Sequence, residues 1–242
     1  MELRNKAILI TGGTSGIGYE FGKALIKMKN RVILLGRDQN KLDEAKKRGF
    51  ETIPCDLANQ DDIEKAAITV QNQYPEICVL FNNAGVQHNY MFSDAVAPFG
   101  KIRSEVDVNL TGQLILTQLL IPQLNTAPEA LIINTTSGLG AFPKSDGLVY
   151  SATKAAMRNF TMGLRYALAR TNIRVLEFIP PVTDTGMTSS RNEKKMSAAT
   201  LVEVAIPQIE KERRVVTVPA IRVFLWIAWW FPGLANKILS KK

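Results

Sequence analysis

Tyr150 and Lys154 are the two residues whose types and spacing best suit chemistry. They are four positions apart in YSATK (150–154), so on a helix their side chains would be neighbours on one face. A free tyrosine has a pKa of about 10 and exchanges protons poorly near neutrality. A lysine ammonium at ~4 Å would favour the phenolate by up to about 4 kcal/mol at an effective dielectric constant near 20, and desolvation would oppose part of that gain. The pair suits general acid–base catalysis, although taken alone the pattern is more often an ordinary pair on a helix surface.

Ser137 favours the chemical interpretation. It lies thirteen residues before Tyr150 and directly follows the apolar run ALIINTT (130–136), where a parallel sheet delivers side chains to its ligand. A hydroxyl there could hydrogen-bond a substrate oxygen and the alkoxide that develops from it. A serine-hydrolase site is disfavoured, because neither Ser137 nor Ser15 lies in G-x-S-x-G and His88 is the only histidine.

A glycine-rich segment, TGGTSGIG (11–18), follows the apolar run AILIT (7–11) and precedes an amphipathic helical pattern. Glycines let an anion approach the backbone, and a helix N-terminus offers it free N–H groups. A Walker A loop is disfavoured because Tyr19 and Glu20 follow Gly18, and the usual G-x-G-x-x-G spacing is also missing. We therefore predict a phosphate-binding turn, and a turn without a ligand is the alternative.

The rest of the chain alternates short apolar runs with helical patterns. Seven strands alternating with helices predict an α/β fold, a doubly wound and mostly parallel sheet with helices on both faces. The ligand then belongs at the carboxyl ends of the strands beside the first strand. We predict strands at 7–11, 31–35, 51–55, 77–81, 130–136, 173–179 and 214–218, and helices at 17–29, 38–48, 60–73, 100–124, 150–170 and 198–212.

Composition limits the classes of protein that fit. The 242 residues are 46% hydrophobic and 21% charged, without an internal linker or repeat, so we predict one domain over 1–220 with an apolar tail at 221–242. Cys55 and Cys78 are not in a C-x-x-C motif, which predicts neither a disulfide scaffold nor a metal site and favours a reducing cytoplasm. The N-terminus lacks the pattern of a signal peptide. The net charge of +8 is spread along the chain, so we predict no nucleic-acid partner.

These motifs together resemble the short-chain dehydrogenase/reductase family. They comprise TGGTSGIG, NNAG (82–85), Asn109 in VDVNLTG, Ser137 in NTTSG and YSATK, and they follow the family's order to about residue 218. IPPVTDT (179–185) also resembles the branch named for an oxidoreductase of the bacterial D-alanine-transfer operon. The resemblance implies a Rossmann-type fold and hydride transfer between a nicotinamide cofactor and a ketone, aldehyde or secondary alcohol.

The resemblance also implies roles for the catalytic residues. Tyr150 would protonate the carbonyl, Ser137 would orient it, and Lys154 would also hold the nicotinamide ribose. Asn109 would support a proton-relay water, although from the sequence alone a cap or a packing role is as plausible.

Arg37 bears on which nicotinamide cofactor is used. It lies 19 residues after Gly18, at the end of the second predicted strand, where NAD-binding sites usually carry an acid. A guanidinium there suits a 2′-phosphate, so we predict NADP(H), with NAD(H) as the alternative because Asp38 is one step away. A solvated surface charge is the other interpretation of Arg37.

Further cofactor contacts follow from the resemblance. Asp56 matches the family's adenine-contacting acid, and Asn83 in NNAG lies where the adenine ribose is contacted. Thr185 matches a cofactor-contacting threonine, whereas Pro181 and Thr183 depart from the family's pattern P-G-x-V-x-T. The predicted cofactor-binding residues are Gly12, Thr14, Ser15, Gly16, Ile17, Gly18, Arg37, Asp56, Leu57, Asn83, Ala84, Gly85, Tyr150, Lys154, Thr183 and Thr185.

Three loops are expected to enclose the substrate. The polar segment 184–197 is a candidate lid or a plain surface loop, and 86–92 and 138–149 would form the other walls. Phe142, Met91, Phe92 and Met187 predict an apolar compartment. His88 is predicted to be a loop residue and not a catalyst.

The tail contains all three tryptophans. Residues 223–231 are nine apolar residues, too few to cross a bilayer, which needs about 20. Arg222 precedes them, and Lys237, Lys241 and Lys242 follow. The tail could pack on its own domain or on a partner subunit, in line with the family's homodimers and homotetramers, or it could lie at a membrane interface. The protein would accordingly be cytoplasmic or membrane-peripheral.

The sequence as a whole predicts an NADP(H)-dependent oxidoreductase. The alternative is a non-enzymatic NADP(H)-binding sensor or scaffold with the same fold. A site that has lost its activity has no need of Ser137, Tyr150 and Lys154 together, and this argues against the alternative.

Overall fold

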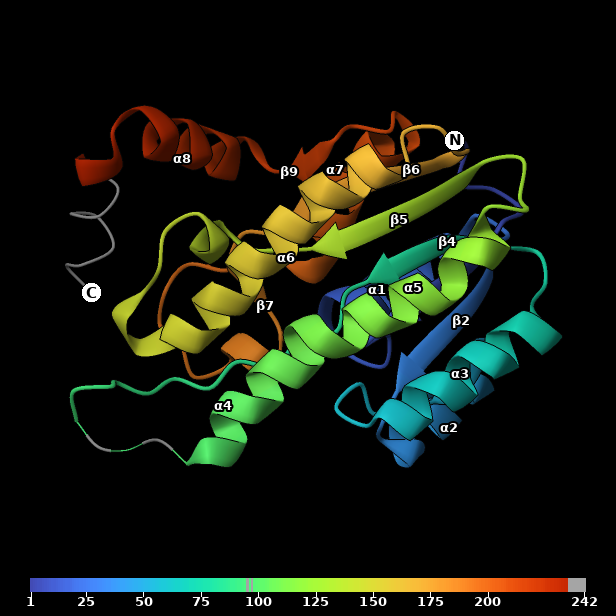
Figure 1. Cartoon of the computed structure of the whole chain (residues 1–242), viewed down its shortest axis with the longest axis horizontal. Coiled ribbons are helices and arrows are strands. Elements are labelled where there is room, and N and C mark those ends of the chain that lie inside the picture. The colour runs from blue at the N-terminus through green and yellow to red at the C-terminus, as the bar shows by residue number, and fades with distance from the viewer. Residues whose placement is uncertain (95, 97, 235–242) are drawn as a thin grey trace.

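The chain folds around a seven-stranded sheet with the strand order β3-β2-β1-β4-β5-β6-β9, in which every pairing is parallel. The computed structural model describes residues 1–94, 96 and 98–234 (Figure 1). This sheet confirms the predicted fold class, and each strand agrees with its predicted range to within one residue. The strands are β1 (Ala7–Thr11), β2 (Arg31–Gly36), β3 (Glu51–Pro54), β4 (Ile77–Asn82), β5 (Ala130–Thr135), β6 (Ile173–Ile179) and β9 (Val215–Thr217).

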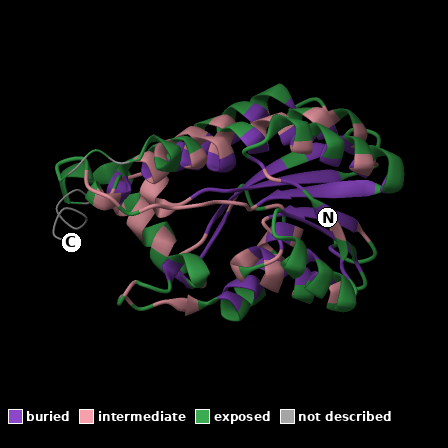
Figure 2. Cartoon of the chain, turned by 90° about the horizontal axis from the view of Figure 1, so that it is seen from below, coloured by how far each residue is buried: buried purple, intermediate pink, exposed green. Residues whose placement is uncertain are grey.

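Helices cover both faces of the sheet. On one face lie α1 (Gly16–Lys27), α2 (Gln39–Lys47) and α7 (Ala198–Glu210), and on the other lie α3 (Gln60–Gln73), α5 (Gly112–Leu124) and α6 (Leu148–Ala167). Figure 2 shows the buried strands between these two layers of helices, whose outer surfaces are exposed. Because helices shield both faces, the strands are near-continuous apolar runs, as in other parallel sheets.

An aromatic cluster lies under the α1 face. The ring centres of Phe21 and Phe81 are 4.8 Å apart, and that of Phe178 lies 5.5 Å from Phe21 and 5.8 Å from Phe81, all edge-to-face. These three fully buried rings join α1 to β4 and β6. Such pairs add about 0.5–1.5 kcal/mol each beyond the burial of their area, and here they fix α1 on the sheet directly behind the glycine loop.

The helix predicted at 100–124 consists of three parts. α4 (Phe99–Val106) leads into a π-helical turn, Asp107–Thr111, and then into α5. A π turn accommodates an extra residue and frequently marks a functional position. Here it contains Asn109, and the following Gly112 is packed so closely that an added Cβ would lie 2.1 Å from the Leu57 carbonyl oxygen.

Two short strands and a helix were not among the predicted elements. β7 (Thr183–Asp184) and β8 (Met196–Ser197) form a short parallel pair that joins the two ends of the predicted lid segment. α8 (Pro219–Trp230) follows β9 and lies beyond the carboxyl ends of the strands (Figure 1). None of the helices in the described part of the chain is long and apolar enough to span a membrane.

Candidate active site

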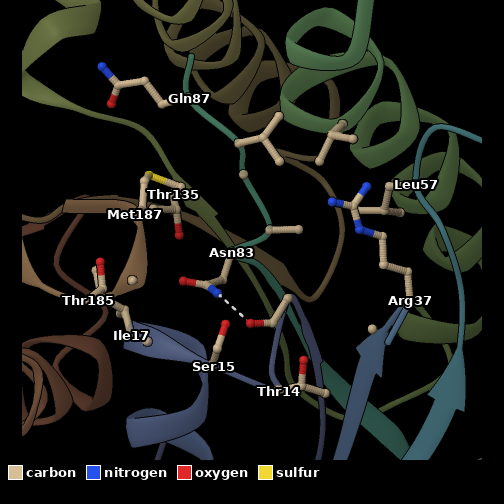
Figure 3. A pocket seen from close by; sticks show the side chains of 18 of the residues that line it. Thr14, Ser15, Ile17, Arg37, Leu57, Asn83, Gln87, Thr135, Thr185 and Met187 are labelled. Atoms are coloured by element: carbon tan, nitrogen blue, oxygen red, sulfur yellow. Dashed lines mark hydrogen bonds between the residues drawn. The ribbon is translucent and has the colours of Figure 1, made fainter. Parts of the chain in front are cut away.

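A long cavity of about 650 Å³ lies at the carboxyl ends of the central strands. The glycine loop, the ends of β2, β3 and β4, and the first turns of α6 contribute its walls (Figure 3). Every predicted cofactor-binding residue lines it except Gly18 and Thr183. The structure therefore brings predicted residues from six separate segments to the carboxyl edge of the sheet, where open α/β sheets bind their ligands.

The glycine loop is shaped for close approach to its backbone. Gly12 has φ +61° and Gly16 φ +55°, and a Cβ at Gly12 would lie 2.8 Å from the Cα of Ala84. Ser15 is the N-cap of α1, but its side chain makes no capping hydrogen bond. The first N–H groups of α1 are thus free of a side-chain cap and available to an anion.

Asn83 fastens the loop after β4 to the glycine loop. Its Nδ2 donates to the carbonyl oxygens of Thr11 at 3.1 Å and Gly12 at 3.3 Å (Figure 3). In return, Thr11 Oγ1 accepts from the backbone N–H groups of Asn83 at 2.9 Å and Ala84 at 3.0 Å. A Cβ at Gly18 would lie 2.5 Å from Asn83 Nδ2, so Gly18 serves this packing and does not line the cavity. Thr11 begins the TGGTSGIG segment, but it was not among the predicted site residues.

Two cations line the cavity near the carboxyl end of β2. Arg37 is exposed, and its Nη1 is 3.8 Å from Asp56 Oδ2; in Figure 3 its side chain extends toward Leu57. Lys41, which the sequence analysis missed, lines the same end. Asp38 is the acid because of which NAD(H) was kept as the alternative cofactor. It caps α2 by accepting from the Lys41 N–H at 3.2 Å, and its other oxygen lies 3.7 Å from Lys41 Nζ.

Lys154 lies between Tyr150 and the end of β5. Its Nζ is 5.7 Å from the centre of the Tyr150 ring and donates to the carbonyl oxygen of Thr135 at 3.0 Å. The side chain is buried, and desolvation lowers its pKa to about 8. Burial in this site therefore disfavours the charged ammonium form of Lys154.

Burial raises the pKa of Tyr150 above its usual value, while a hydrogen bond to Ser137 and the charge of Arg191 act in the opposite direction. The pKa shift is thus opposite to the one expected from the sequence, because the cost of desolvating the phenolate is larger than the combined effect of the Ser137 hydrogen bond and the charge of Arg191. Ser137 Oγ also accepts from the Leu139 N–H at 3.1 Å, at the start of a 3₁₀ turn. That bond leaves its hydroxyl proton free to be donated.

Asn109 is buried beneath the site and lines neither of its cavities. Its Oδ1 accepts from the Val86 N–H at 2.7 Å, and its Nδ2 donates to the Val86 carbonyl at 2.8 Å and contacts Thr153 Oγ1 at 3.3 Å. The packing role that the sequence left open is therefore present in the structure. The proton-relay role stays a prediction.

Glu105 is a buried carboxylate that the sequence analysis missed. It accepts from the His88 N–H at 2.9 Å and from the Tyr90 hydroxyl at 3.1 Å, and burial raises the pKa of Tyr90 to about 12. It thereby holds the loop that follows Asn83. Its position within a helical pattern gives no sequence signal, because only the fold shows that this turn of α4 faces inward. His88 is a loop residue, as predicted, with its ring nitrogen 3.1 Å from Ser104 Oγ.

A second cavity, of about 320 Å³, adjoins the first at Tyr150. Ser137 lines it, together with Met187 from the predicted lid. Ile221 and Phe224 of α8 form part of its apolar wall. The sequence analysis had expected that wall from 86–92, 138–149 and 184–197 alone. Phe142 packs behind Phe224 with the ring centres 6.2 Å apart, and Phe92 is exposed, so the apolar compartment exists with partly different walls.

The outer face of α8 is apolar and exposed. Trp226, Trp229 and Trp230 are 59%, 81% and 63% exposed, whereas Ala228 on the inner side is buried. Within the described part of the tail, which does not include Lys237, Lys241 and Lys242, the inner side of α8 packs on the domain and the tryptophans do not. A partner subunit and a membrane surface remain as the two candidates for covering them.

Comparisons with known proteins agree with this geometry. A model of the short chain dehydrogenase family matches residues 6–196. The uncharacterized oxidoreductase DltE of Bacillus subtilis is 36% identical over 197 residues, which are 81% of this chain and 78% of DltE. This match confirms the resemblance to the branch named for the D-alanine-transfer operon.

Solved structures share the fold over nearly the whole chain. A short chain dehydrogenase from Burkholderia cenocepacia, solved in complex with NADP, superposes with a TM-score of 0.88 at 24% identity and covers 99% of both chains. A short chain dehydrogenase/reductase from Burkholderia phymatum, in complex with NAD, gives a TM-score of 0.85 at 21% identity over 97% of this chain and 96% of its own. At these identities the likeness concerns the fold alone.

Proposed function

This chain belongs to the short chain dehydrogenase family of oxidoreductases, and we propose that it transfers hydride between NADP(H) and a ketone or aldehyde, or the corresponding alcohol. One observation carries the proposal. Tyr150 is one of six residues that line both cavities, and it is the one among them that can exchange a proton; Lys154 lines the large cavity and Ser137 the small one. A cofactor site and a substrate site joined at a group that can exchange a proton are what this reaction requires.

The large cavity fits a nicotinamide dinucleotide. Gly12 and Gly16 bend the loop so that the backbone and the N-terminus of α1 would hold the pyrophosphate. Asp56 and Leu57 would contact the adenine, Asn83, Ala84 and Gly85 the adenine ribose, and Thr185 the nicotinamide end. When bound, the cofactor supplies or accepts the hydride.

Residues of this chain would donate the proton to the substrate and stabilise the phenolate that remains. The raised pKa keeps Tyr150 protonated near neutrality, so it would donate to the carbonyl oxygen, with Ser137 orienting that oxygen through a second hydrogen bond. Lys154 would stabilise the phenolate left behind and hold the nicotinamide ribose. Asn109 would keep Val86 in place and, in the relay role, support the water that returns the proton.

Arg37 and Lys41 support NADP(H) over NAD(H). Both line the end of the cavity where the ribose phosphate would lie, and forked, charge-assisted bonds suit a phosphate. Asp38 also lines this cavity, but its Oδ1 accepts the capping bond of α2 and its Oδ2 lies 3.7 Å from Lys41 Nζ, so the negative charge there is partly offset. The neighbours include both an NADP complex and an NAD complex, so the proposal rests on these side chains.

We further propose a homodimer or homotetramer in the cytoplasm, with the exposed face of α8 on a partner subunit or on a membrane surface. The free, buried Cys55 and Cys78 are in keeping with a reducing compartment. Exposed tryptophans along one helix face support such a contact, because a monomer gains nothing from leaving that area in water.

The test compares a tyrosine in the site with one outside it. Tyr150→Phe should reduce NADPH-dependent turnover of a ketone and aldehyde panel by about 10²–10⁴-fold, the usual contribution of a proton-transfer group, while NADPH fluorescence titration shows binding retained. Tyr166→Phe is the matched control, since Tyr166 is on the same helix but 79% exposed. Tight NADPH binding without turnover of any carbonyl would favour the sensor or scaffold, and no NADPH binding would contradict the proposal.

A further inference from the structure

Arg191 is a half-buried cation in the wall of the smaller cavity, and it has no role in the reaction proposed above. It lies in the segment between β7 and β8, and its side chain is 15% exposed. Its Nη2 donates to Gln87 Oε1 at 2.5 Å, across the cavity mouth from the loop after β4. Its Nε N–H is buried and has no hydrogen-bond partner among the residues that the structure describes.

An enclosed donor on a charged group is costly to leave unpaired. Losing such a hydrogen bond costs more than losing one between neutral groups, and buried polar atoms nearly always have a partner. Glu193 Oε1 is 3.7 Å from Nη1, too far for a hydrogen bond, so it offsets part of the charge without meeting Nε. Nε itself is enclosed by protein, but Arg191 lines the pocket that contains Ser137 and Tyr150, and of the four N–H groups on its Nη atoms one donates to Gln87.

The charges around the pocket favour an anion. Two cations, Arg191 and Lys144, line it against one carboxylate, Glu193, and the rest of the wall is largely apolar, with Leu139, Met187 and Phe224. Lys144 Nζ is 3.2 Å from Asp146, which leaves Arg191 as the better placed of the two. Arg191 is also close enough to act electrostatically on Tyr150, where its charge opposes the effect of burial.

We propose that the substrate is an oxo acid, a carbonyl compound whose carboxylate binds Arg191 while its carbonyl oxygen faces Ser137 and Tyr150. Forked, charge-assisted bonds are the geometry in which arginine binds carboxylates. The inference rests on the proposed oxidoreductase function and adds the substrate class. A purely structural Arg191, which only ties its loop to Gln87, would not distinguish acids from neutral carbonyls.

The experiment compares acids with their esters. NADPH oxidation is followed with acetoacetate, 4-oxopentanoate and 5-oxohexanoate, each beside its methyl ester, for the wild type, Arg191→Gln and Arg191→Lys. In the wild type kcat/KM should favour at least one acid over its ester by about 10-fold or more. Arg191→Gln should lower that acid-to-ester ratio by about 10–100-fold, mainly through KM, as expected for the loss of a charge-assisted bond. Arg191→Lys should restore part of it.

Arg103→Gln is the matched control, because Arg103 is an exposed arginine on α4 outside both cavities; its acid-to-ester ratio should equal that of the wild type. Turnover of esters and neutral ketones without any preference for acids would overturn the inference and leave the proposed function standing. An equal fall in kcat/KM for acids and esters in Arg191→Gln would also overturn the inference, because it would indicate that Arg191 only holds its loop to Gln87.

A binding measurement separates the two failures. Calorimetric titration of pentanoate, which has no carbonyl to reduce, into the NADPH-saturated protein should show binding that Arg191→Gln weakens by about 10-fold or more. Such binding without turnover of any carbonyl would retain the anion site and reject the oxidoreductase. Absence of pentanoate binding to the wild type would overturn the anion site.

Discussion

The side-chain amide of Asn109 forms hydrogen bonds with both backbone groups of Val86, accepting from its N–H at 2.7 Å and donating to its carbonyl at 2.8 Å. An amide paired in this way reproduces one step of a β ladder and fixes the backbone of a loop that has no strand neighbour of its own. Val86 directly follows the NNAG segment that lines the large cavity. Asn109 thus connects the π-helical turn to the wall of the proposed cofactor site.

Asn109→Ala should therefore affect stability and cofactor binding together. Two backbone groups of Val86 lose their partner, which should lower the free energy of unfolding by about 1–3 kcal/mol and weaken NADPH binding as the loop loosens. Urea unfolding and NADPH fluorescence titration measure the two effects. Asn125→Ala, at an exposed asparagine after α5, should change neither. If Asn109→Ala keeps its stability and NADPH affinity but loses kcat, the proton-relay role explains the residue better.

Lys154 should give stability a characteristic dependence on pH. Its pKa is about 8 in the folded protein against 10.5 for a lysine in water, so the folded state gives up the proton first. The cost of burying the ammonium is fully present below pH 8, falls as the pH rises from 8 to 10.5, and is absent above that. Between pH 7 and pH 10.5 the wild type should gain about 3 kcal/mol of unfolding free energy relative to Lys154→Met.

Urea unfolding of both proteins at several pH values gives this difference directly, because groups other than Lys154 titrate alike in the two. Lys211→Met, at an exposed lysine, should follow the wild type at every pH. A difference between the wild type and Lys154→Met that is constant across the pH range would mean that the buried lysine is not destabilised as an ammonium.

The sequence predicted the parts of the structure that depend on local pattern. Apolar runs bounded by polar residues placed all seven strands, because a strand covered on both faces needs such a run at its own position. The glycine loop and the Tyr150–Lys154 spacing are also local, and both line the cavity as predicted. The resemblance extended this to residues such as Asn83 and Arg37, whose place follows from the order of the strands.

The remaining features depend on contacts between distant segments. Lys41 and Glu105 belong to no motif, and the side chain of Thr11 has its role only because the loop after β4 folds against it. The pKa of Tyr150 is raised by burial, and the spacing of residues in the sequence does not indicate how deeply a side chain is buried. α8 completes the smaller cavity from a segment about 80 residues after Ser137, so its contribution could not be predicted from the loops nearer in sequence.

Arg37 should determine the choice of cofactor. Arg37→Ser removes a guanidinium that would bind the 2′-phosphate, so NADPH affinity should fall by about 10–100-fold while NADH affinity changes little. Fluorescence titration with both cofactors measures the ratio. Arg4→Ser is the control, because Arg4 is similarly exposed and does not line the cavity. An equal loss of affinity for both cofactors would mean that Arg37 acts on the shared part of the dinucleotide, and the preference for NADP(H) would lose its support.

The exposed tryptophans of α8 should be needed for a contact outside the chain. Replacing Trp226, Trp229 and Trp230 by serine removes the three exposed indole rings of that face but leaves Ile221 and Phe224 in the pocket wall. The triple variant should therefore retain NADPH binding, and it should lose either the oligomer seen by sedimentation velocity or the flotation of the wild type with vesicles containing anionic lipid.

The two readouts assign the partner. Loss of the oligomer alone indicates a subunit interface, as expected if the apolar face is buried between copies. Loss of flotation alone indicates a membrane interface, where tryptophan side chains are favoured at the level of the lipid head groups. Tyr166→Ser and Phe99→Ser, at exposed aromatic residues on α6 and α4, are controls for a general loss of surface apolarity and should change neither readout. A wild type that is monomeric and does not float would mean that the exposed face of α8 has neither kind of partner.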